Sequence, residues 1–111
     1  MNINWIKEFP AAITVCDTKG KIIGMNNKSA EVFINEGGYE LLDKNIFDCH
    51  SDNSTRIIKE LIAEKKTNVY TIEKNGIKKL IYQAPWYEHG ELKGLVELSI
   101  EIPFDIPHHK R

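Results

Sequence analysis

Residues 68–102 read "NVYTIEKNGIKKLIYQAPWYEHGELKGLVELSIEI", and this stretch decides the fold. Its runs are rich in Val, Ile and Tyr, residues that favour β-strands. Asn75-Gly76 stands between two such runs and is the strongest short-range signal for a two-residue hairpin loop. A loop of that length places Glu73 opposite Lys78, which is an attractive cross-strand pair. A second turn signal, "HGEL", follows, so the stretch predicts three consecutive antiparallel strands.

The last of these runs, "LVELSIEI", alternates between apolar and polar residues. Its apolar positions are Val96, Leu98, Ile100 and Ile102, and its polar positions are Glu97, Ser99 and Glu101. Successive side chains of a strand point to opposite faces of the sheet. We therefore expect the apolar face to be buried and the face that carries Glu97 to meet water. Pro85 cannot donate to a strand ladder, so it marks a bulge or a strand edge.

A first hairpin is predicted near the start of the chain, in "AITVCDTKGKIIGMNN" at residues 12–27. Two β-rich runs flank "DTKG", which has Asp at the first and Gly at the last position of a type I turn. Asn26 or Asn27 can then cap a helix, because its side chain accepts a hydrogen bond from an unpaired backbone N–H. The short helix that follows, over "KSAEVFINEGG", ends at its two glycines.

The clearest helix is predicted over residues 55–66, "TRIIKELIAEKK". It carries an apolar stripe of Ile57, Ile58, Leu61 and Ile62. The preceding "SDNS" favours caps and turns, so we expect it to break helical continuity with "YELLDKNIFDCH", a stretch of short helical turns. At the N-terminus, "NINWIKEF" has the spacing of a short amphipathic helix ended by Pro10. It would form either a lid over the core or a homodimer contact.

Strands segregated from helices predict an α+β fold, one antiparallel sheet with helices on one face. We expect a domain at 10–103, an N-terminal cap segment at 1–9 and a loosely held tail at 104–111. The chain has 111 residues and a net charge of −1, which argues against nucleic acid as a partner. No membrane-spanning run or signal peptide is evident, so we expect a cytoplasmic protein whose two cysteines are reduced. The sequence shows no nucleophile spaced with a base, so we do not expect an enzyme.

The order and punctuation of these elements resemble the PAS domain family over roughly residues 8–103. The residues that carry the likeness are "ITVCDTKGKIIGMN", "LLDKNIFD", the long helix, "EKNGIKKLIYQAPWY" and "GLVELSIEI". The resemblance implies a five-stranded antiparallel sheet of order 2-1-5-4-3, curled over the helices with a small cavity between them. Some PAS domains hold haem, flavin or an organic acid there, and most sense and relay through dimerisation or an output domain. A narrower likeness links "FDCHSDNSTRII" to PAS modules that accompany hemerythrin-like domains in some bacterial proteins, with Ser51 where a proline is expected.

Cys49 and His50 are adjacent, so their side chains point in different directions on a helix or a strand. We therefore expect that they do not bind one metal ion together, and we predict no metal site. Steps of three and four from Phe47 would put His50 on the apolar side and Cys49 away from it. His50 would then be an axial haem ligand, a donor to another ligand, or a structural residue bonded to the backbone. The resemblance adds that the family's better-known haem histidine is replaced here, by Ile57 or Ile58, and that the reactive cysteine of flavin-type members is missing near Ile46.

Aromatic residues on the late strands can line a cavity or simply pack the sheet. The predicted ligand-binding residues are Phe47, His50, Ile58, Tyr70, Tyr82 and Trp86. The cofactor is unknown, and haem on His50 is one candidate. We expect a homodimeric sensor that binds a small ligand, or senses redox state, and relays this to a signalling partner. The alternatives are a ligand-free interaction module and a haem-based gas sensor.

Overall fold

The computed structural model describes residues 3–48 and 51–111, and within them five strands form one antiparallel sheet. The strands are β1 (Ala12–Asp17), β2 (Ile22–Met25), β3 (Asn68–Lys74), β4 (Ile77–Glu88) and β5 (Glu91–Ile102). The helices are α1 (Asn27–Val32) and α2 (Asp52–Glu64), with short 3-10 helices η1 (Ile34–Glu36), η2 (Gly38–Leu41) and η3 (Ile46–Asp48). The sheet order β2-β1-β5-β4-β3 confirms the predicted α+β class and topology.

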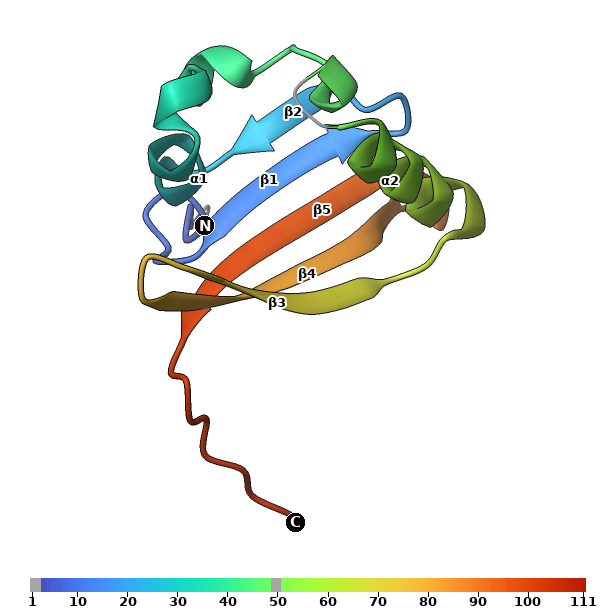
Figure 1. The fold of residues 1–111 in the computed structure, drawn as a ribbon. Helices are drawn as coiled ribbons and strands as arrows, with labels where there is room; N and C mark the ends of the chain where they lie inside the picture. The colour runs from blue at the N-terminus through green and yellow to red at the C-terminus, as the bar shows by residue number, and fades with distance from the viewer. Residues whose placement is uncertain (1–2, 49–50) are drawn as a thin grey trace.

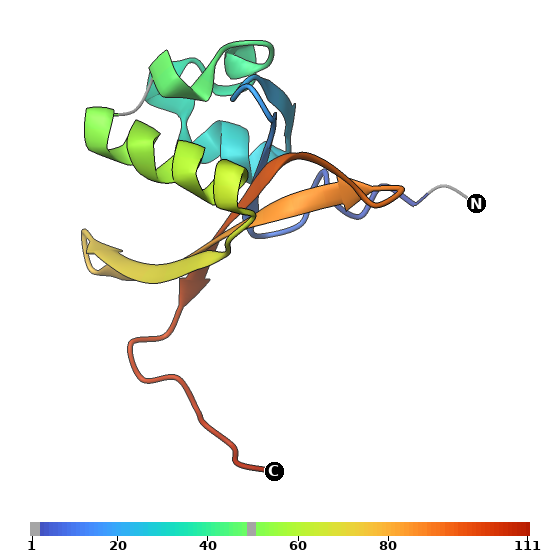
Figure 2. The ribbon, with the colours of Figure 1, turned by 90° about the vertical axis from the view of Figure 1, so that its right-hand side faces the viewer.

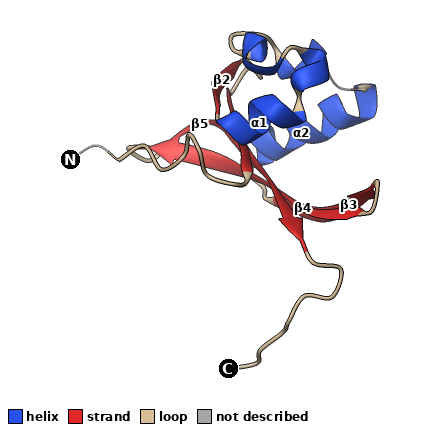
Figure 3. Cartoon of the chain, turned by 90° about the vertical axis from the view of Figure 1, so that its left-hand side faces the viewer, coloured by secondary structure: helices blue, strands red, loops and turns tan. Residues whose placement is uncertain are grey.

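Both α-helices lie on the same face of a curved sheet, and the N-terminal segment leaves on the opposite side (Figures 1, 2 and 3). We call the face toward the helices the inner face and the other the outer face. The buried core lies between the inner face and the helices. It consists of Cys16, Ile22, Leu41, Ile46, Ile58, Leu61, Ile62 and Leu95.

The hairpins of the last third form as their turn residues predict. Asn75 and Gly76 have φ of 55° and 78°, the left-handed conformation that a tight hairpin loop requires. Glu73 pairs with Lys78 across that loop, as expected. Pro85 lies where β4 has run past the end of β3 and pairs with β5 alone, so the strand-edge prediction is confirmed.

Asn26 is the N-cap of α1, and its side chain accepts a hydrogen bond from the backbone N–H of Ser29 at 3.0 Å. The helix is shorter than predicted, because it ends at Val32. Two 3-10 helices follow it, η1 before Gly37 and η2 after Gly37. The expected break in helical continuity is present at Ser51, whose backbone is extended, but α2 begins earlier than predicted, at Asp52 rather than at Thr55. Ser51 is itself the N-cap, so the rest of "SDNS" forms the first turn of the helix.

The predicted N-terminal helix is absent from the described residues 3–10, which form a bend and a single turn at Lys7 and Glu8. A short helix is stable only where packing of its apolar face supports it, and the apolar side chains of this segment are exposed. Instead, the buried side-chain amide of Asn26 donates to the carbonyl of Ile6 at 3.0 Å and anchors the backbone there. The apolar side chains of the segment remain largely exposed: Ile3, Trp5, Ile6 and Phe9.

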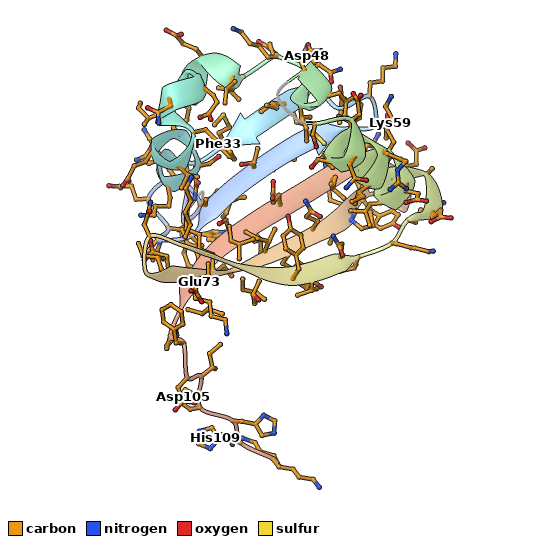
Figure 4. The ribbon with its side chains drawn as sticks, viewed as in Figure 1. Phe33, Asp48, Lys59, Glu73, Asp105 and His109 are labelled. Atoms are coloured by element: carbon orange, nitrogen blue, oxygen red, sulfur yellow. The ribbon has the colours of Figure 1, made fainter. Side chains whose placement is uncertain are left out.

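The C-terminal tail after β5 has no regular structure and runs away from the sheet, with Asp105 and His109 along it (Figure 4). Among the described residues, no helix is both long enough and apolar enough to cross a membrane.

Candidate ligand site

Three adjoining compartments lie between the inner face and the helices, and together we call them the inner cavity. The first has a volume of about 110 Å³ and is lined by Thr14, Ile22, Met25, Phe33, Glu36, Leu41, Ile46 and Glu97. The second, of about 210 Å³, is lined by Ala12, Thr14, Val32, Phe33, Tyr70, Ile72, Lys79, Ile81, Glu97 and Ser99. The third, of about 390 Å³, is lined by Ser54, Ile57, Ile58, Asn68, Tyr70, Gln83 and Glu97. Glu97 borders all three.

The register of the sheet places a line of polar residues across the inner face. Thr14 on β1 is opposite Glu97 on β5, Glu97 is opposite Gln83 on β4, and Gln83 is opposite Asn68 on β3. Ser29 of α1 continues the line. We call these five residues the inner polar row.

Hydrogen bonds hold both ends of the inner polar row in place. The hydroxyls of Thr14 and Ser29 lie 2.6 Å apart, and the amide of Asn68 donates to Gln83 Oε1 at 3.0 Å. Ser29 and Gln83 are buried. The row therefore presents fixed polar groups inside a cavity whose other lining residues are mainly apolar, the arrangement typical of small-molecule sites.

The apolar walls come from opposite sides. Phe33, at the end of α1 beside the inner face (Figure 4), lines the first and second compartments. Ile57 and Ile58 of α2 line the third compartment, where they face Tyr70 of β3. A molecule in the cavity would thus touch the sheet and the helices together.

The charge of Glu97 reaches other groups of the cavity. Burial raises the pKa of Tyr70, and the negative charge of Glu97 raises it further. Burial also raises the pKa of the Cys16 thiol, partly offset by the backbone of Leu95, with Asp17 and Glu97 as smaller contributions that raise it. Glu97 is therefore a source of negative charge that acts on both Tyr70 and Cys16.

Comparisons with known proteins rest on structure. No family model matches the chain, and no curated protein matches it in sequence. The PAS-haem oxygen sensor Aer2 from Vibrio cholerae is similar at 15% identity, with 84% of this chain and 95% of that chain covered and a TM-score of 0.66. The PAS domain of the histidine kinase ThkA is similar at 16% identity, with 81% and 97% covered and a TM-score of 0.67.

The chain has the PAS fold. The VqmA dimer of Vibrio cholerae is also similar, at 10% identity and a TM-score of 0.70, with 89% of this chain and 49% of that longer chain covered.

Two of the residues predicted to bind ligand come together at the cavity of this PAS fold. Ile58 and Tyr70 both line the third compartment. Phe47 lies in a separate groove. The ammonium of Lys59 is 4.9 Å from the centre of the Phe47 ring. The edge of the same ring fills the space beside Gly20. His50 and its neighbour Cys49 lie outside the described residues.

Tyr82 and Trp86, which were also predicted to bind ligand, are not among the described lining residues of the inner cavity. Tyr82 pairs with Leu98 and therefore shares the outer face, because its neighbour in the strand, Ile81, is an inner-face residue. The indole of Trp86 instead donates a hydrogen bond to the backbone carbonyl of Cys16 at 3.1 Å.

The expected orientation of β5 was also wrong, and so the sequence prediction missed Glu97. The alternating pattern correctly separates Glu97 from Val96 and Leu98, but Glu97 faces the helices and the apolar residues form the outer face. The signal was present as a glutamate at the centre of the last strand. Whether this glutamate lies in the cavity depends on which face of the sheet the helices cover. The alternating pattern of a single strand does not determine that face.

Proposed function

We propose that this PAS domain is a sensory module that binds a small molecule in the inner cavity. The observation that supports the proposal is the inner polar row, fixed by hydrogen bonds and surrounded by apolar walls. The two smaller compartments, of about 110 and 210 Å³, suit a ligand with a single ring and a few substituents. The proposal assigns no catalytic step to the chain.

Binding would be relayed through the helices that close the cavity. Ile57 and Ile58 of α2 contact the third compartment directly, so a ligand there changes what α2 packs against. A ligand shifts the position of α2 only if it binds two arrangements of the helix with different affinity. Redox sensing through Cys16 is less well supported, because its thiol is buried and its pKa is raised, which keeps it protonated and unreactive.

We propose a second copy of this chain as the partner. The outer face is apolar, and the N-terminal segment, which carries exposed apolar side chains, lies on the same side of the sheet (Figure 2). Trp5 and Phe9, whose rings pack edge to face, are 57% and 44% exposed. Large exposed aromatic groups of this kind are enriched at protein interfaces. The similar VqmA is a dimer.

Haem is the second candidate ligand, and it is favoured by the likeness to the PAS-haem sensor Aer2. The described lining of the inner cavity does not fit haem. No histidine is among these residues, and the carboxylate of Glu97 would repel the haem propionates. Haem binding would therefore depend on His50. The absorption spectrum of the protein with added haem tests this, and identical spectra for wild type and His50→Ala would exclude the axial role.

The test of ligand binding is native mass spectrometry of the purified protein, followed by a small-molecule screen read by protein NMR. Ser99→Leu places a larger side chain in the second compartment, and Thr71→Leu makes the same kind of change at an exposed position on the outer face. We expect Ser99→Leu to weaken binding and Thr71→Leu to leave it unchanged. Equal effects of the two variants, or no bound molecule in any experiment, would favour a ligand-free interaction module.

A further inference from the structure

We infer that β3 pairs with β3 of a second copy of this chain, in an antiparallel register centred on Thr71, so that the two sheets join into one. The contact would form along the side of β3 that faces away from β4, which we call the free edge. It is separate from the outer-face contact proposed above, and it does not depend on the ligand-binding function.

The free edge is long and its apolar side chains are exposed. β3 is the outermost strand on the side of the sheet away from β2, and within the described residues it pairs with β4 alone (Figure 1). Val69, Tyr70 and Ile72 are 51%, 42% and 42% exposed. β3 contains no proline, its pairing with β4 has no bulge, and its charged residues, Glu73 and Lys74, are confined to the loop end. It therefore lacks the usual protection of an edge strand and is a template for another strand.

The opposite edge of the sheet, at β2, is protected by the chain itself. The backbone N–H of Ile22 donates to the carbonyl of Lys44 at 2.9 Å, and the N–H of Asp43 donates to the carbonyl of Ile22 at 2.8 Å. Lys21 forms an isolated bridge with Asn45 beside them. The contrast between the two edges leaves β3 as the one that a second chain can extend.

The hairpin loop determines which backbone groups of β3 point outward. A two-residue loop makes Lys74 and Ile77 a hydrogen-bonded pair, and such pairs alternate along an antiparallel ladder. The N–H and C=O groups of Val69, Thr71 and Glu73 therefore point away from β4, toward the free edge. A second β3 in antiparallel orientation offers the same groups in return.

The side chains of β3 are complementary to themselves when the register is centred on Thr71. Each Thr71 then lies opposite the Thr71 of the other copy, and Tyr70 lies opposite the partner's Ile72. Pairs of threonines, and pairs of an aromatic with a β-branched side chain, are among the favourable cross-strand pairs. Such a contact is isologous, so both copies use the same surface.

The neighbouring registers fit less well. With the centre at Thr71, Lys74 lies opposite the partner's Asn68, and β3 is paired over its whole length. A centre at Tyr70 would place Lys74 opposite the partner's Lys66, and like charges directly opposite each other are destabilising. A centre at Ile72 would place Asn68 opposite the partner's hairpin loop and shorten the paired segment. Charge and length therefore both favour Thr71.

Pairing would also bring the partner to the rim of the inner cavity. Tyr70 and Ile72 line the second compartment, and each would pack against the other's counterpart across the joint. A ligand in that compartment would contact a wall that the partner helps to hold. If the ligand strengthens pairing, pairing strengthens ligand binding by the same factor. This consequence alone rests on the proposed ligand-binding function.

A disulfide at the centre of the register tests the pairing directly. In a hydrogen-bonded antiparallel pair, opposite Cα atoms are about 5.5 Å apart, within the range that a disulfide spans. Thr71→Cys should therefore form a disulfide-linked dimer under mild oxidation, read by non-reducing gel electrophoresis, with wild type as the baseline for the native cysteines. Val69→Cys is the matched control, because it is exposed on the same face but lies about 13 Å along the strand from the partner's Val69. It should stay at the wild-type level.

A second experiment measures the contact without a cross-link. Trp5→Glu removes the proposed outer-face contact, so sedimentation of this variant over a concentration series into the millimolar range reports the free edge. We expect its mass to rise toward that of a dimer. Adding Thr71→Pro removes an outward N–H and no bond to β4, so it should abolish the rise, whereas Thr71→Val should keep it. Circular dichroism establishes that each variant is folded.

The outcomes separate the free edge from the other proposals. Cross-linking of Thr71→Cys no greater than that of wild type or of Val69→Cys would overturn the inference. A mass of Trp5→Glu that stays at the monomer, or a dimer that survives Thr71→Pro, would do the same. Loss of the dimer in Phe104→Glu would assign the free edge to the C-terminal tail instead of to β3. None of these results bears on the outer-face contact or on ligand binding, which Trp5→Glu against wild type and Ser99→Leu test.

Discussion

Asn26 connects three segments of the chain, and its replacement by alanine should destabilise the fold strongly. The side chain is 1% exposed. Its Oδ1 accepts hydrogen bonds from the backbone N–H groups of Ile13 and Ser29, both at 3.0 Å. Its Nδ2 donates to the carbonyls of Ile6 at 3.0 Å and Ala11 at 2.8 Å.

The size of the effect follows from what alanine leaves behind. Loss of the helix cap costs about 1 kcal/mol. Each buried backbone group left without a partner costs about 1–3 kcal/mol, and Ile13 and Ala11 lose buried hydrogen bonds. We therefore expect Asn26→Ala to lower the free energy of unfolding by about 3–7 kcal/mol, a large part of the roughly 5–15 kcal/mol of a typical domain.

Urea unfolding followed by far-UV circular dichroism measures this difference. The matched control is Asn27→Ala, because the neighbouring side chain accepts only an exposed hydrogen bond from the Tyr39 hydroxyl, and we expect a loss below about 1 kcal/mol. Asn26→Asp keeps the acceptor and removes the amide donor, so it should fall between wild type and Asn26→Ala. Losses of similar size for Asn26→Ala and Asn27→Ala would refute the reasoning.

Three further predictions concern the sheet and its surfaces. A Cβ at Gly94 would lie 1.9 Å from the carbonyl oxygen of Cys16, so Gly94→Ala should lower the free energy of unfolding in urea by more than about 3 kcal/mol. A Cβ at Gly24 would lie 3.5 Å from its nearest atom, so Gly24→Ala should lower it by about 1 kcal/mol or less. The raised pKa of Cys16 means that the folded state holds the thiol proton more tightly than the unfolded state. The free energy of unfolding should therefore fall as pH rises above about 9, and Cys16→Ala should reduce that fall. Trp5→Glu should shift a dimer toward monomer in light scattering, while Ile34→Glu, at an exposed position on η1, should not; equal masses for the two variants would contradict the proposed interface.

The predictable parts of the fold depend on local chemistry. Asn75-Gly76 specifies its own loop conformation, and that loop fixes the pairing of Glu73 with Lys78. Residue type alone limits the cap to Asn26 or Asn27, and the structure shows that it is Asn26. The prediction of an N-terminal helix was wrong because a short helix needs packing of its apolar face, and the spacing of the apolar residues does not show whether that face is packed.

The candidate site was less predictable because it depends on contacts between distant segments. The alternation in β5 gives two faces, and the rule that the apolar face is buried assigned them the wrong way round. The rule that the apolar face of a strand is buried fails for β5, because its apolar residues form the outer face of the sheet. Tyr70 and Tyr82 look equivalent in the sequence, yet the register of β3 with β4 puts them on opposite faces.

The inner polar row makes the chemistry of the cavity depend on the register of one strand. A shift of β5 by a single residue would turn Glu97 outward and bring Val96 or Leu98 inward, because side chains alternate with a period of two. An insertion or deletion of one residue in the His89–Gly90 turn could thus shift the register of β5. The acidic cavity would then become an apolar one without any substitution in its lining. Related chains that differ only in this turn could therefore recognise different molecules on the same scaffold.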